Sequence, residues 1–103
     1  MKITRGTTPT VRLTVSDFDL YGTDEIHLYF SQNGKMRFSK VTPEVMIDGN
    51  AIQVELTQED TYKLKKGEEV KMQFRLKRED GKILASGETY AEVDDIDDND
   101  EVI

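Results

Sequence analysis

Apolar and polar residues alternate along most of this chain, and that alternation limits the fold more than any other feature of the sequence. A period of two places every second side chain on the same face of an extended strand, so each alternating run predicts a strand with one buried face. The runs cover 10–15, 25–30, 35–39, 45–47, 51–56, 70–77 and, less regularly, 82–93. The pattern therefore favours a protein built almost entirely of β-strands.

Three Asn-Gly or Asp-Gly pairs separate these runs. They are Asn33-Gly34, Asp48-Gly49 and Asp80-Gly81. Both dipeptides tolerate the positive φ of a type I′ turn, whose twist matches that of two paired strands. The sequence therefore predicts three antiparallel hairpins, which pair 25–31 with 35–40, 44–48 with 51–56, and 69–78 with 82–92.

One segment, 57–64, departs from the alternation. Thr57 is followed by the acids Glu59 and Asp60, which favour the start of a helix. Lysines and a glycine follow, as is typical of the end of a helix. We expect a short helical turn that crosses between two sheets, with Tyr62 and Leu64 beneath it.

About seven short strands separated by frequent turns are typical of an immunoglobulin-like antiparallel β-sandwich. A chain of 103 residues fits one domain of this kind. The predicted fold class is therefore all-β, with a single sandwich domain over 1–93 and one short helical turn near 57–64. A small open barrel is the alternative architecture.

The net charge of −7 comes entirely from the C-terminal end of the chain. Residues 92–103 contain seven acids and no base, whereas residues 1–91 contain 14 acids and 14 bases. A run of like charges is typical of a solvated segment, so 94–103 is interpreted as an acidic tail. Its last two residues are apolar, which a purely solubilising segment does not need. We therefore expect the tail to bind a basic protein surface through Asp94, Asp95, Asp97, Asp98, Val102 and Ile103.

Three basic residues, Lys71, Arg75 and Lys77, lie on the polar face of the longest predicted strand. A basic stripe of this kind is a candidate site for a protein partner or for the acidic tail. Interleaved aromatic residues would suit it to single-stranded nucleic acid. The outward neighbours on this strand are instead Glu69 and Gln73, and the body of the chain is neutral. We therefore expect protein partners and no nucleic acid.

The composition excludes several kinds of site. The chain has no cysteine, which removes disulfides, thiolate zinc sites and cysteine nucleophiles. The single histidine, His27, removes any site that needs two imidazoles. The sequence contains no glycine-rich phosphate loop and no nucleophile elbow. We therefore expect a chain without enzymatic activity, cofactor or metal.

Hydropathy argues against a membrane role. No apolar run approaches the ~20 residues that a membrane-spanning helix needs. The N-terminal residues lack the apolar segment of a secretory signal peptide, so we expect no secretion by that route.

An acidic loop supports a rival interpretation. Four carboxylates fall within 17–25, and hard cations such as calcium prefer oxygen ligands. A turn-rich connection in which aspartates cap backbone groups accounts for the same residues. A cytosolic carbohydrate- or cation-binding sandwich that uses this loop is therefore the alternative function.

Several short motifs occur in a distinctive order along the chain. They are Arg5-Gly6-Thr7-Thr8-Pro9-Thr10, Asp48-Gly49-Asn50, Leu56-Thr57-Gln58-Glu59-Asp60-Thr61, Asp80-Gly81-Lys82 and Leu84-Ala85-Ser86. This order resembles small prophage-encoded structural proteins of Gram-positive bacteria, which are similar to the immunoglobulin-like N-terminal domain of phage baseplate upper proteins. The resemblance implies a virion structural protein of the tail or baseplate, present in the host cytoplasm during assembly and then in the virion. It carries over no catalytic residues.

The predicted function is therefore a non-enzymatic structural or assembly module of a phage or prophage, which acts through protein–protein contacts. Its partners would be other phage structural subunits or further copies of itself. A rigid sandwich offers exposed strand edges that an extended segment can complete with main-chain hydrogen bonds. The acidic tail is the segment of this chain best suited to reach a neighbouring subunit.

Overall fold

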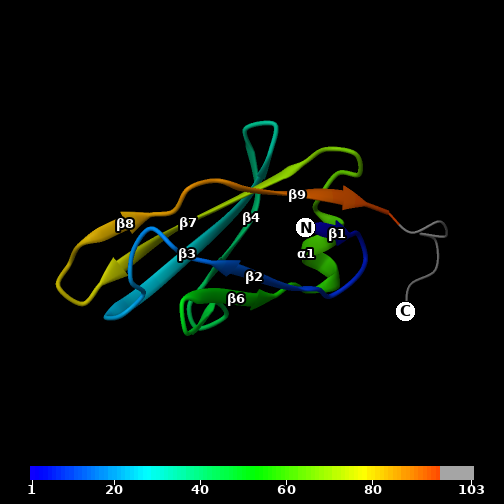
Figure 1. The fold of residues 1–103 in the computed structure, drawn as a ribbon. Coiled ribbons are helices and arrows are strands. Elements are labelled where there is room, and N and C mark those ends of the chain that lie inside the picture. Colours follow the sequence, from blue (N-terminus) through cyan, green and yellow to red (C-terminus); the bar gives the residue numbers. More distant parts are fainter. Residues whose placement is uncertain (96–103) are drawn as a thin grey trace.

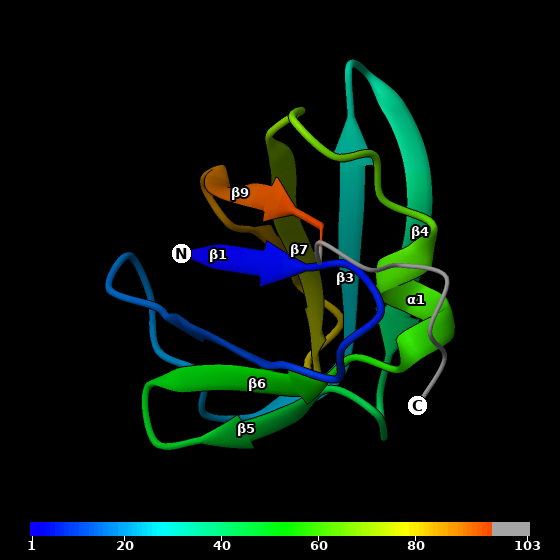
Figure 2. The same ribbon diagram turned by 90° about the vertical axis from the view of Figure 1, so that its right-hand side faces the viewer.

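The structure is a computed structural model that describes residues 1–95 as two β-sheets packed face to face (Figure 1; Figure 2). Within these residues the larger sheet has six strands and the smaller sheet has three. The predicted all-β sandwich is therefore confirmed. The expected partner-binding residues Asp97, Asp98, Val102 and Ile103 lie outside the described residues.

The strand order is that of an immunoglobulin-like sandwich. The larger sheet runs β1-β9-β7-β3-β4, with β8 paired separately to β7, and the smaller sheet runs β2-β6-β5. β2, β6 and β5 occupy the places of strands B, E and D, and β9, β7, β3 and β4 those of G, F, C and C′. The bounds are β1 Lys2–Thr4, β2 Thr10–Thr14, β3 Thr23–Gln32, β4 Lys35–Val41, β5 Met46–Asp48, β6 Ala51–Glu55, β7 Val70–Arg78, β8 Ile83–Ala85 and β9 Thr89–Asp94.

All three predicted hairpins are present, since β3 pairs with β4, β5 with β6, and β7 with both β8 and β9. In the first turn φ is positive at both central residues, 49° at Asn33 and 74° at Gly34, as a type I′ turn requires. In the other two turns only Gly49 and Gly81 have positive φ. Their predicted turn type was wrong, although the predicted pairing was right.

Three details differ from the prediction. β1 and β9 pair in parallel, so the sandwich is not wholly antiparallel; strands so far apart in sequence have no tight turn to set their direction. The last predicted strand is divided into β8 and β9, so residues 1–95 contain nine strands rather than about seven. Met36 is 55% exposed, because a β-bulge at Phe30/Ser31 shifts the register and turns Met36 away from the core.

The core lies between the two sheets and takes alternate residues from each strand. All four apolar residues of the longest predicted strand, 70–77, which forms most of β7, are buried as expected. The main inward side chains are Val11, Leu13, Ile52 and Val54 from the smaller sheet, and Ile26, Leu28, Phe30, Phe38, Val70, Met72, Phe74 and Leu76 from the larger sheet. Because side chains alternate, burial of this set turns the polar residues between them outward. Gln32, at the end of β3, is a polar residue that follows the inward positions and is buried.

The predicted helical turn is present as α1, Gln58–Tyr62, between β6 and β7 (Figure 2). Leu64 is buried beneath it, as expected, with 1% of its surface exposed. Tyr62 is only half-buried, and the neighbouring Thr61 takes the inner position instead.

A buried ion pair joins α1 to β4. Lys40 Nζ lies 2.6 Å from Asp60 Oδ2, and each of the two side chains is 9% exposed. Asp60 also accepts a hydrogen bond from the Thr57 N–H and so completes a capping box at the start of the helix. Burial by itself raises the pKa of Asp60, but Lys40 and Thr57 outweigh it and hold that pKa below its ordinary value. Burial likewise opposes, without cancelling, the rise in the pKa of Lys40 that Asp60 and Glu44 produce.

Asp60→Asn should destabilise the protein by about 3 kcal/mol at neutral pH, because the buried Lys40 ammonium then keeps only the exposed carboxylate of Glu44, 3.3 Å away. Urea unfolding measures the change. Asp48→Asn is the control, since Asp48 pairs with Arg12 at the surface, where the loss should be at most about 1 kcal/mol.

The cost of Asp60→Asn should also depend on pH. The pKa of Asp60 is lower in the folded chain than in the unfolded chain, so its contribution is complete above the unfolded pKa and is lost as pH falls through the folded pKa. The difference in stability between the wild type and Asp60→Asn should therefore shrink as pH is lowered below about 4. A difference that stays constant down to the acid transition would contradict this role for the carboxylate.

Candidate functional site

The predicted basic stripe lies on the outer face of the larger sheet, which we define as the side turned away from β2, β5 and β6. Lys71, Arg75 and Lys77 all point to this face from β7, because their neighbours Val70, Met72, Phe74 and Leu76 are buried. β3 lies beside β7 and contributes a second row of outward residues. The stripe is therefore part of a larger surface that two central strands hold in a fixed register.

A stacked group of three side chains lies at the centre of this surface. The His27 and Tyr29 rings stack with centroids 6.3 Å apart and an interplanar angle of 18°. The Arg75 guanidinium lies 5.5 Å from the centroid of the Tyr29 ring and donates a hydrogen bond of 2.9 Å to its hydroxyl. His27 Nε2 lies 3.0 Å from the Glu25 carboxylate. The Tyr29 ring is therefore held from two sides while part of it still faces solvent.

Exposed apolar side chains lie on the same face as the stacked group. Met36 is 55% exposed, Tyr90 49% and Ile83 66%. Their cross-strand partners Ser31, Lys71 and Lys77 place all three on the outer face. A shallow hollow of about 370 Å³ runs between Tyr29, Met36, Lys71 and Arg75. The outer face therefore combines exposed apolar and aromatic area with fixed positive charge.

A hydrogen bond and an ion pair at one end of the outer face restrain Tyr90 and Lys71. The Tyr90 hydroxyl donates a hydrogen bond of 2.5 Å to Glu88, and Lys71 Nζ lies 3.7 Å from the same carboxylate. The hydrogen bond from Tyr90 and the charge of Lys71 lower the pKa of Glu88. The same hydrogen bond raises the pKa of Tyr90. Lys71 is thus paired within the sheet instead of standing free for the acidic tail.

The first two tail residues belong to the sandwich. Asp94 ends β9, and its carboxylate lies 3.0 Å from Lys2 Nζ; this hydrogen bond and charge raise the pKa of Lys2. Asp95 is only 8% exposed and lies 2.6 Å from Arg5 Nη1. Both aspartates were expected to bind a partner, but the structure pairs them with the N-terminal segment of their own chain.

Arg5 was not identified from the sequence, yet it connects three segments. Its Nε donates to the Leu64 carbonyl at 2.8 Å, its Nη2 to the Tyr62 carbonyl at 3.3 Å, and its Nη1 to Asp95. The guanidinium also lies 5.4 Å from the centroid of the Tyr62 ring. Arg5 therefore fastens the N-terminus, the end of α1 and the end of β9 together. No local pattern indicates this role, since its partners lie 57 to 90 residues away.

The acidic loop 17–25 does not converge on a common centre. Asp19 caps the Tyr21 N–H, and its carbonyl accepts a hydrogen bond from Arg78. Glu25 turns toward His27 instead. Among residues 1–95, no group of three or more histidine or acidic side chains is placed to hold a metal ion. The loop is therefore better described as a turn-rich connection in which aspartates cap backbone groups.

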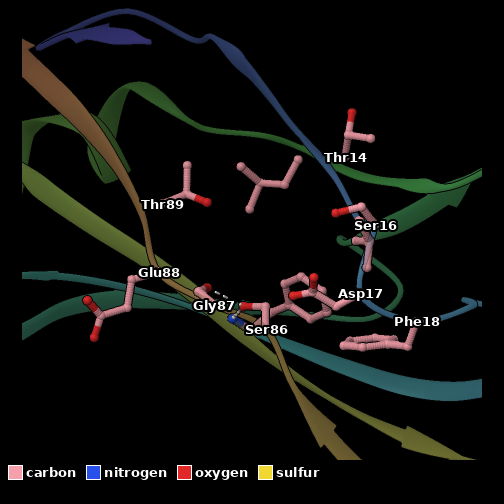
Figure 3. Close-up of a pocket in the computed structure, with 11 residues that line it drawn as sticks. Thr14, Ser16, Asp17, Phe18, Ser86, Gly87, Glu88 and Thr89 are labelled. Carbon is pink, nitrogen blue, oxygen red and sulfur yellow. Dashed lines mark hydrogen bonds between the residues drawn. The ribbon is translucent and has the colours of Figure 1, made fainter.

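The gap between β8 and β9 leaves a small pocket at the side of the sandwich. Figure 3 shows residues 14–18 on one side of it and 86–89 on the other. Its volume of about 210 Å³ is below the ~300–1,000 Å³ of most small-molecule sites. Phe18 packs edge-on against Phe74 there, with ring centroids 6.2 Å apart. We therefore interpret the pocket as a consequence of the gap between β8 and β9. The outer face is the stronger candidate site.

Comparisons with known proteins add no relative. No model of a known protein family matches the chain, and no curated protein matches it. The part of the chain that the structure describes contains no helix long and apolar enough to cross a membrane. The resemblance to phage structural proteins thus stays a prediction from the sequence motifs.

Arg5→Lys should destabilise the protein by about 1–3 kcal/mol, because an ammonium cannot donate in three fixed directions and leaves buried acceptors unpaired. The midpoint of urea unfolding measures this loss. The matched change Lys2→Gln removes only the half-exposed pair with Asp94 and should cost less than about 1 kcal/mol. Equal losses in the two variants would show that Arg5 acts as an ordinary surface charge.

Proposed function

We propose that this chain is a non-catalytic β-sandwich that works by protein–protein contact through the outer face of its larger sheet. The observation that carries the proposal is the stacked group of His27, Tyr29 and Arg75, with exposed Met36 and Tyr90 on the same face. Tyrosine, methionine and arginine are enriched where proteins bind one another. Tyrosine and arginine are also among the residues that most often dominate binding energy.

The rigidity of the group supports a binding role. Ordering a side chain during association costs conformational entropy, so a ring that is already held loses less on binding. Tyr29 is held by the hydrogen bond from Arg75 and by the stack with His27. It stands on a ten-residue strand that is paired on both sides. The outer face therefore offers a preformed surface.

The setting we propose is the particle of a phage or prophage, where the chain serves as a structural or assembly module. The sequence motifs that resemble prophage structural proteins support this part of the proposal. The partners would then be other structural subunits or copies of the same chain, met first in the host cytoplasm and then in the virion. The proposal requires no cofactor, nucleic acid or membrane.

Tyr29→Ala and Arg75→Ala should each weaken partner binding by roughly 30-fold or more, the loss typical of a hot-spot residue. The probes are the proteins encoded by the genes on either side, co-expressed with the full chain, and the chain itself in sedimentation velocity. Arg12→Ala is the matched control, since Arg12 lies on β2 of the opposite sheet and pairs with Asp48 at the surface.

Three results would count against the proposal. A complex that both outer-face variants leave intact would move the interface elsewhere. A complex weakened equally by Arg12→Ala would show that the loss is not specific to this face. Flanking genes that encode no tail, portal or capsid proteins, together with a chain that stays monomeric, would refute the phage setting.

A further inference from the structure

A second basic surface lies away from the outer face, around the loop that follows α1. We call Lys35, Lys63, Lys65 and Lys66 the lysine loop surface. All four side chains are exposed. None of them forms an ion pair within residues 1–95, although Lys2, Lys40 and Lys71 do. These four charges are therefore available to an acidic partner.

Gln32 holds this surface in place. Its buried side-chain amide donates to the carbonyls of Lys65 and Glu68, each at 2.9 Å, and its carbonyl accepts from the Lys65 N–H at 2.8 Å. Lys35 is the direct cross-strand partner of Gln32, so both side chains point to the side of the loop. Two acids, Glu68 and Glu69, follow the lysines on the same loop; Glu68 lies 3.9 Å from Arg37, and Glu69 is exposed. The lysines thus stand on a fixed backbone.

The acidic end of the chain leaves the sandwich beside this loop. The Gly67 N–H donates to the carbonyl of Val93 at 3.1 Å. Arg5 binds the Leu64 carbonyl and the Asp95 carboxylate at the same time, at 2.8 and 2.6 Å. One guanidinium group therefore separates the last described residue from the backbone of the lysine loop.

Charge and reach both favour the chain's own tail as the occupant of the lysine loop surface. Residues 96–103 contain four acids and no base. Eight residues span at most about 26–29 Å, which is ample for a neighbouring loop. A tethered segment acts at an effective concentration in the millimolar range, so individually weak charge pairs suffice.

The cations first expected to receive the tail are less suitable. Lys71 is paired with Glu88, and Arg75 is bonded to Tyr29. Lys77 lies near the turn between β7 and β8, at the opposite end of the larger sheet from the end of β9 (Figure 1).

We propose that the lysine loop surface is a binding site for an acidic peptide segment and that residues 96–103 of the same chain occupy it. An acidic partner that binds this surface must then displace the tail. A partner that captures the tail uncovers the lysines. This inference does not depend on the outer face, because no residue is shared between the two surfaces.

Paramagnetic relaxation enhancement in the full chain tests the proposal. Because the chain lacks cysteine, Asn99→Cys places a single spin label in the tail and leaves every acid intact. At about 0.05 M salt, the amide signals of 63–66 should broaden, while those of 77–82 should stay sharp. The broadening should weaken at about 0.5 M salt, where exposed charges are screened over a few ångströms, but part of it should remain because residue 99 is tethered only four residues from Asp95. Equal broadening at the two salt concentrations would overturn the proposal.

One triple variant and one double variant complete the experiment. Lys63→Gln/Lys65→Gln/Lys66→Gln should reduce the broadening at low salt to its level at high salt, whereas the control Lys77→Gln/Lys82→Gln should leave it unchanged. The remaining amide signals show in the same spectra that each variant is folded. Broadening centred on 71–75, or none at low salt, would overturn the proposal. Broadening that disappears when unlabelled chain is added in excess would assign the occupant to a second copy and overturn docking within one chain.

Discussion

Burial of the facing sides of two sheets is the constraint on which the rest of this structure depends. The inward residues of β3 and β7 are almost completely buried, with Ile26, Phe30 and Val70 at 0% exposure. Since successive side chains of a strand point to opposite faces, this burial also fixes the outward set. His27, Tyr29 and Arg75 meet because their neighbours are held in the core. If either strand shifted its register by one residue, its polar side chains would be buried in the core and the outer face would lose its present set of side chains.

Three polar interactions close the sandwich where its strands end. Lys40 and Asp60 join β4 to α1, Gln32 holds the loop after α1, and Arg5 ties the N-terminal segment and Asp95 to that loop. Each of these groups is wholly or largely shielded from water, so each would be costly without its partner. These three interactions therefore determine where the lysine loop and the start of the tail lie relative to each other.

The core of β7 could be predicted from the alternation, the three hairpins from their Asn-Gly and Asp-Gly pairs, and the short helix from its capping residues, because each of these signals depends on neighbouring residues. The bulge that exposes Met36 and the break between β8 and β9 depend on packing between distant strands, so no local sequence pattern predicts them. The same limit applies to the candidate site. Lys71, Arg75 and Lys77 were identified as one outward stripe from a single strand. Tyr29 reaches Arg75 from 46 residues away, so the aromatic part of the site appears only when two strands are placed in register.

The two basic surfaces suit different kinds of contact. On the outer face the cations are bound to neighbours: Arg75 to Tyr29, and Lys71 to Glu88. Their positions are set, so they contribute shape and specificity, and the apolar area around them contributes the burial that stabilises a complex. The lysines of the loop are unpaired within residues 1–95 and surrounded by solvent, which favours long-range attraction of acidic segments over tight, geometry-dependent binding. A tethered acidic tail is well matched to the second surface, because tethering compensates for charge pairs that are individually weak.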